Sequence, residues 1–109
     1  MEREVVFSKN VEIYLNELMI LLFEKQYFGF PESAKQYVDK LISYIEQNID
    51  IVQSKNAPEY FMRFGEDMKY VTYQPNKNTT WYVFFQKHDN IYLVRHISNN
   101  HISGKFFVD

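Results

Sequence analysis

The chain has 109 residues, of which 46% are hydrophobic and 24% charged, with a formal net charge of −2 at pH 7. The length predicts one domain over residues 1–109, and the charge balance excludes a disordered chain and a strongly basic nucleic-acid clamp. The sequence has no cysteine, so disulfides, thiol catalysis and Cys-ligated zinc are excluded. Without a signal peptide or an apolar run of membrane-spanning length, we expect a soluble cytoplasmic protein with no membrane contact.

The N-terminal half predicts a short strand followed by two helices. Residues 5–7 are apolar, and Ser8 can cap a helix over about residues 9–26, whose apolar side chains recur every three or four positions. Gly29 and Pro31 interrupt this pattern, and a second helix is predicted over about residues 31–50. Because the connection is short, the two helices should form an antiparallel hairpin.

The C-terminal half predicts three strands. Residues 68–74, 79–86 and 90–98 are rich in aromatic and β-branched side chains, and turn-forming residues separate them. They should form an antiparallel meander whose middle strand is apolar on both faces. The predicted fold is therefore α+β, in the order β-α-α-β-β-β, with the helical hairpin packed on one face of a small antiparallel sheet.

Charge is divided unevenly between the two halves. Residues 1–50 hold nine acidic and five basic residues, whereas residues 51–109 hold five acidic and seven basic residues and all three histidines. This division predicts different partners for the two halves.

The order of elements and several sequence strings resemble the RelE/ParE superfamily of bacterial toxins, often called plasmid-stabilisation proteins. The resemblance covers nearly the whole chain. It is carried by Glu4–Ser8 before the first helix, by Ala34, Tyr37, Val38, Leu41 and Ile45 on the second, by Arg63-Phe64-Gly65, and by residues 79–85 and 91–101. It implies the toxin of a type II toxin–antitoxin system, held inactive by a cognate protein antitoxin. Such toxins act either on DNA gyrase or as ribosome-dependent mRNA endonucleases.

The chain departs from the endonuclease members of this superfamily in its cations. Those members typically carry several Lys and Arg on the sheet face, where they stabilise charge at the attacked phosphate. Here residues 68–74 contain only Lys69, and residues 79–85 contain no cation. The gyrase-inhibiting mode is therefore favoured, while an mRNA endonuclease and a degenerate, non-toxic binding module remain alternatives. Whether the chain is an enzyme is left open.

If the chain is a nuclease, the predicted catalytic residues are Lys69, Arg95 and His101. The lysine and the arginine would bind the scissile phosphate, and the histidine would transfer protons near neutral pH. The alternative for Arg95 is a structural ion pair with Glu46 or Asp50. The alternative for the histidines is a structural position in a turn or at a strand edge.

Target-binding residues are predicted where cations and amides gather near the strand ends. The candidates are Arg63, His96, Asn99 and Asn100. For the two asparagines the alternative is a tight turn with a positive φ. The strand aromatics could stack on bases, or they could simply pack in the core: Tyr70, Tyr73, Trp81, Tyr82 and Tyr92.

Antitoxin binding is predicted on the first helix, which is more apolar than one buried face requires. The candidates are Ile13, Tyr14, Met19, Ile20 and Phe23. Self-association through the same surface is the alternative, so a homodimer is left open. The side of the sheet away from the hairpin is expected to be uncovered and to meet another macromolecule. No metal or cofactor is predicted, because His96 and His101 alone are too few ligands for zinc.

Overall fold

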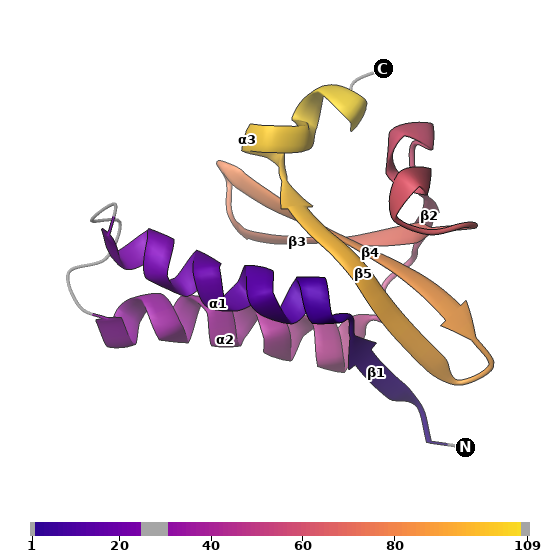
Figure 1. Cartoon of the computed structure of the whole chain (residues 1–109), viewed down its shortest axis with the longest axis horizontal. Coiled ribbons are helices and arrows are strands. Elements are labelled where there is room, and N and C mark those ends of the chain that lie inside the picture. The colour runs from indigo at the N-terminus through magenta and orange to yellow at the C-terminus, as the bar shows by residue number, and fades with distance from the viewer. Residues whose placement is uncertain (1, 25–30, 108–109) are drawn as a thin grey trace.

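Two helices from the N-terminal half pack against a sheet built mostly from the C-terminal half (Figure 1). The computed structural model describes residues 2–24 and 31–107. Strand β1 (Glu4–Phe7) leads into helix α1 (Lys9–Glu24), and helix α2 (Pro31–Asn48) returns antiparallel to it. Ser8 caps α1 as predicted, since its Oγ accepts a hydrogen bond from Val11 N at 3.3 Å. The predicted break at Gly29 lies outside the described residues.

The three predicted C-terminal strands are present as a meander. They are β3 (Lys69–Asn76), β4 (Thr79–His88) and β5 (Ile91–Asn99), which pair antiparallel in sequence order. The structure adds a two-residue strand, β2 (Lys55–Asn56), beside β3, and the sheet order is β1-β5-β4-β3-β2. The prediction of a wholly antiparallel sheet is wrong, because β1 pairs with β5 in parallel.

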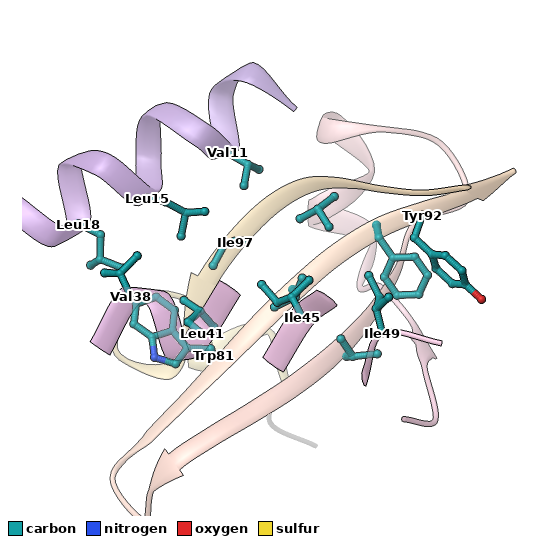
Figure 2. Close-up of a cluster of buried hydrophobic side chains, with 14 residues drawn as sticks. Val11, Leu15, Leu18, Val38, Leu41, Ile45, Ile49, Trp81, Tyr92 and Ile97 are labelled. Carbon is teal, nitrogen blue, oxygen red and sulfur yellow. The ribbon is translucent and has the colours of Figure 1, made fainter. Parts of the chain in front are cut away.

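The main core lies between the helical hairpin and the sheet (Figure 2). Figure 2 shows Val11, Leu15 and Leu18 of α1 pointing towards β5, with side chains of α2 and Trp81 of β4 beside them. The indole Nε1 of Trp81 donates to Tyr37 Oη at 2.9 Å, which ties β4 to α2. Each fully buried aliphatic side chain here contributes about 1.5–3 kcal/mol. This core places both helices on the same face of the sheet.

The opposite face of the sheet is covered by the chain itself. Two short 3₁₀ helices, η1 (Glu59–Phe64) and η2 (Gly104–Phe107), lie there, joined to the sheet through helix α3 (Asn100–Ser103) and β2 (Figure 1). We call the buried residues on this face and the rings packed on them the aromatic cluster: Ala57, Phe61, Phe64, Met68, Tyr70, Tyr82, Phe84, Phe106 and Phe107.

The expectation that this side would be uncovered is therefore wrong. Tyr82 and Phe84 alternate with Trp81, Val83 and Phe85, so they point away from the hairpin. Leaving two aromatic side chains in water is unfavourable, and the rings of Phe61 and Phe107 cover them, with centroid distances of 4.2 Å for Phe61–Phe84 and 4.0 Å for Tyr82–Phe107.

Neither long helix within the described ranges is both long and apolar enough to span a bilayer.

Candidate functional site

One half of β5 has a strand on only one side. β1 pairs with residues Ile91–Val94 of β5 and then ends, whereas β4 pairs along both halves. A β-bulge interrupts the β4–β5 ladder at this point: Phe84 lies opposite His96 and Phe85 opposite Val94, so Arg95 is the extra residue. Bulges of this kind change the direction of a side chain and bend the strand. Beyond Val94, β5 is an edge of the sheet within the described residues.

A cavity of about 570 Å³ lies beside this edge. We call it the β5 cleft. Its walls come from the start of α1, from η1, and from α3 and η2, and its base comes from β5. It is lined by Asn10, Val11, Tyr14, Tyr60, Phe61, Phe64, Arg95–Ser98, Ile102, Ser103, Lys105 and Phe106.

Two cations line the β5 cleft, and no carboxylate does. Arg95 is exposed, and its Nε donates to the carbonyl oxygen of Phe64 at 3.2 Å. Lys105 is also exposed, with its Nζ 5.3 Å from the ring centroid of Phe106. Neither forms an ion pair with a described residue. The cleft therefore presents positive charge against an aromatic surface.

The alternative reading of Arg95, an ion pair with Glu46 or Asp50, is wrong. Asp50 pairs instead with Arg3, whose Nε lies 2.8 Å from Asp50 Oδ2 and whose Nη2 donates to the carbonyl oxygen of Glu46. Arg3 thus links the N-terminal strand to the end of α2, and Arg95 forms no ion pair with a described residue.

His96 acts here as an aromatic ring more than as a cation. Its ring stacks on Phe64 with a centroid distance of 4.0 Å and an angle of 6° between the planes, and it also touches Phe61 and Phe84. Burial lowers the pKa of His96 below the ordinary value of 6.5. The imidazole is therefore neutral at pH 7, and it forms part of the wall between the cleft and the aromatic cluster.

Arg63 lies at the rim of the same region. Its guanidinium carbon is 3.8 Å from the ring centroid of Tyr60, and its Nε donates to the Tyr60 carbonyl oxygen at 3.0 Å. The ring of Tyr60 also stacks on Phe106 with a centroid distance of 4.2 Å and meets Phe61 edge-on at 5.1 Å. Of the predicted target-binding residues, the structure thus gathers Arg63 and His96 around the cleft that Arg95 lines.

The three residues predicted for nuclease chemistry are not brought to one place. Lys69 lies opposite Phe85 and donates to Asn56 Oδ1 at 3.2 Å, beside β2. His101 follows the other end of β5, where its Nε2 is 3.4 Å from Thr79 Oγ1. The positions of Phe85 and Trp81, opposite Asn99, are about 13 Å apart along β4. Lys69 and His101 therefore cannot act on the same phosphate in this arrangement.

Asn99 and Asn100 have structural hydrogen bonds. The side chain of Asn99 caps α3 by accepting from His101 N and Ile102 N at 2.9 and 3.2 Å. Asn100 accepts from Thr80 N at 2.9 Å and donates to the carbonyl oxygen of Asn78 at 3.1 Å. The prediction of a tight turn with a positive φ is wrong, because the backbone of Asn99 is extended, with φ −139°. The pair joins the end of β5 to the β3–β4 turn.

The five residues predicted to bind an antitoxin do not share one face of α1. Ile13, Ile20 and Phe23 are exposed, whereas Tyr14 and Met19 are half-buried against the main core.

Two members of that set, Tyr14 and Ile20, line one hollow together with residues outside the set, among them Leu21, Ile102 and the acidic Glu17 and Glu24. Ile20, Leu21 and Ile102 line a hollow of about 400 Å³ between α1 and α3, with exposed fractions of 51%, 47% and 68%. We call these three residues the apolar strip. Leu21 belongs to the apolar excess of α1, but nothing in the sequence indicated that α3 would place Ile102 beside it.

The strand aromatics pack inside the molecule. Trp81, Tyr82 and Tyr92 are buried, and Tyr73 stacks on Tyr44 of α2 at 4.5 Å. Tyr70 contacts Phe107 at 5.0 Å within the aromatic cluster. Of the two readings, core packing is the one that these contacts support.

Comparisons of the chain with family models, with curated proteins and with solved structures find no match. Within residues 2–24 and 31–107, no group of three or more His, Asp or Glu side chains is arranged to hold a metal ion. Function is therefore inferred from the chain's own residues.

Proposed function

We propose that this chain is the cytoplasmic toxin of a type II toxin–antitoxin pair, with a RelE/ParE-like fold, neutralised by a cognate protein antitoxin. The observation that carries the proposal is the apolar strip. Ile20, Leu21 and Ile102 come from two elements and expose large aliphatic side chains beside one hollow. Grouped exposed apolar side chains mark a surface for another protein.

The sequence strings that resemble the RelE/ParE superfamily support the same proposal by their positions in the fold. Glu4–Ser8 forms β1 and the cap of α1, residues 79–85 form most of the central strand, and residues 91–101 form β5 with the start of α3. The helical hairpin on one face of the sheet is the arrangement that the resemblance implies.

The non-nucleolytic, gyrase-inhibiting mode is favoured over mRNA cleavage. Lys69 and His101 lie at separate places, and the aromatic cluster covers the sheet face on which a cationic catalytic set would be expected. One observation keeps an RNA target as the second candidate: Arg95 and Lys105 line the β5 cleft without a carboxylate, and Arg63 lies at its rim.

The first test is inducible expression of the chain alone and together with the neighbouring reading frame. We expect growth arrest when the chain is expressed alone and recovery when the neighbour is present. In the variant Ile20→Asp, a charge in the apolar strip should weaken the recovery and leave the arrest. Ile51→Asp is the matched control, because Ile51 is 74% exposed and lies outside the strip.

Absence of arrest, or absence of recovery, would contradict the toxin proposal. Recovery that Ile20→Asp leaves intact would remove the apolar strip as the antitoxin surface.

The target is tested with the purified chain in two assays, DNA supercoiling by gyrase and cleavage of mRNA on translating ribosomes. We expect inhibition of supercoiling and uncut message. Cuts in the message that Arg95→Ala abolishes would establish the endonuclease alternative instead.

A further inference from the structure

The β5 cleft is a hollow with a closed base. The residues at this base are buried: Val11, Phe61, Ile97, Ser98 and Ser103. Ile97 and Ser98 are 3% and 4% exposed, so the β5 backbone there has little surface left for an added strand. The volume of about 570 Å³ falls within the range of about 300–1,000 Å³ that is usual for small-molecule sites. The cleft therefore suits a small molecule better than an extended peptide.

The walls of the cleft are aromatic and partly exposed. Tyr14 of α1, Phe64 of η1, His96 of β5 and Phe106 of η2 are half-buried, so each ring keeps surface for a ligand. Burial raises the pKa of Tyr14 and lowers the pKa of His96, so both rings are uncharged at pH 7. Rings from four elements favour an aromatic ligand, because stacked and edge-to-face contacts add to the hydrophobic gain.

Two cations at the rim set the charge that the cleft prefers. Arg95 and Lys105 are exposed, and no described carboxylate lines the cleft with them. The Nε of Arg95 donates to the Phe64 carbonyl oxygen at 3.2 Å, and its two Nη groups have no described hydrogen-bond partner. Glu66 and Asp67 share a separate hollow with Arg95 but lie beyond ion-pair distance of it. The Nη groups can therefore bind a ligand carboxylate through two parallel hydrogen bonds.

The base of the cleft also holds a hydrogen-bond donor among apolar side chains. Ser98 Oγ and Ser103 Oγ are 2.6 Å apart, and both residues are buried. The pair uses one hydroxyl hydrogen between them, and the other hydrogen has no acceptor within the described part of the chain. A few fixed polar groups in a mostly apolar hollow are typical of small-molecule sites. The serine pair therefore offers a ligand one polar contact at the base.

We infer that the β5 cleft is a binding site for a small aromatic carboxylate. The rings of the ligand lie against the aromatic walls, and its carboxylate meets Arg95 and Lys105 at the rim. Two cations above an apolar base favour a single anionic group on a large apolar body over a nucleic acid, in which every nucleotide carries a charge. The inference goes beyond the proposed function and does not depend on it.

The test uses the purified full-length chain and biphenyl-4-carboxylate, which has two aromatic rings and one negative charge. In an NMR titration we expect saturable one-to-one binding with a Kd of about 1 mM or tighter. The shifted backbone amides should lie within residues 95–98 and 102–106. Two matched probes separate charge from aromaticity. The neutral carboxamide should bind about tenfold more weakly, and the dicyclohexyl carboxylate, with both rings saturated, about fivefold more weakly.

Charge selection is tested with the double variant Arg95→Gln/Lys105→Gln. It should weaken binding of the carboxylate about tenfold and leave binding of the carboxamide unchanged, a difference that general damage to the cleft would not produce. The matched control is Lys40→Gln/Lys77→Gln, which removes two exposed cations from α2 and the β3–β4 turn. It should leave binding of both probes unchanged.

Absence of saturable binding by the carboxylate, or amide shifts that lie outside the cleft, would overturn the inference. Equal affinity for the three probes, or equal effects of the two double variants, would overturn it as well. A single-stranded RNA oligonucleotide that shifts the same amides and displaces the biphenyl would assign the cleft to nucleic acid and would also overturn it. Growth arrest is scored separately, so carboxylate binding without arrest would remove only the toxin proposal, and arrest without carboxylate binding only this inference.

Discussion

At the scale of single residues, Arg95 and His96 show what could be predicted and what could not. Both were candidates because cations and titratable groups in an apolar strand need an explanation. The sequence could not show the bulge that sets Arg95 apart from the ladder, because a bulge depends on how β4 and β5 pair. Nor could it show that Phe64, 32 positions earlier, stacks on His96. Contacts across such separations depend on the fold.

Protonation of His96 should destabilise the folded chain. Burial lowers the pKa of His96 in the folded state, so the unfolded chain takes up a proton first as the pH falls through about 6.5. The free energy of unfolding should therefore decrease below that pH, until the pH passes the folded-state pKa and the decrease ends. In His96→Gln this part of the pH dependence should be absent.

Urea unfolding of both proteins between about pH 7.5 and pH 5 checks this prediction, with an NMR titration of the His96 ring as the direct measurement. Equal pH dependence in the two proteins, or a pKa of His96 at or above 6.5, would contradict it.

At the scale of elements, long periodic segments were predictable and short ones were not. α1, α2 and the β3–β5 meander follow from repeated apolar spacing, and the structure confirms them with small changes at their ends. β2, with two residues, and the short helices η1, α3 and η2 contain too few residues for a period to appear. These short helices cover the second sheet face and form two walls of the β5 cleft. Because the helices were not predicted, neither that cover nor the cleft was predicted.

The apolar face of α2 should dominate its contribution to stability. Ile45 is fully buried against the sheet, whereas Ile51, just beyond the helix, is 74% exposed. Ile45→Ala should lower the free energy of unfolding by about 2–5 kcal/mol, because it removes buried methyl and methylene groups and leaves a cavity. Ile51→Ala makes the same chemical change on the surface and should cost less than about 0.5 kcal/mol. Similar losses in the two variants, measured by urea unfolding, would show that α2 packs differently.

At the scale of the whole molecule, the sheet separates two clusters of different origin. The main core combines aliphatic side chains of the hairpin with one face of the sheet, and the aromatic cluster combines rings of η1 and η2 with the other. Residues 81–85 are apolar on both faces, which indicated a cover for the second face, and another macromolecule was the expected cover. What the pattern could not show was that the second cover comes from the same chain, because a partner protein would produce the same pattern. The apolar strip lies outside both clusters.

The C-terminal segment should be removable from the sheet without unfolding the main core. Phe107 stacks on Tyr82 at 4.0 Å and 9° and belongs only to the aromatic cluster. Phe107→Ala should lower the free energy of unfolding by about 1–3 kcal/mol, less than a fully buried Phe because the ring is half-buried, while unfolding stays cooperative. Binding of a hydrophobic dye should increase, since Tyr82 and Phe84 lose part of their cover.

Phe23→Ala is the matched control, because Phe23 is 39% exposed and lies in neither cluster. It should cost less than about 0.5 kcal/mol and should not increase dye binding. If Phe107→Ala changed neither stability nor dye binding, the segment would not hold the cover. If it unfolded the chain completely, the two clusters would form one cooperative core, and the second face of the sheet could not be opened to a partner while the hairpin stays folded.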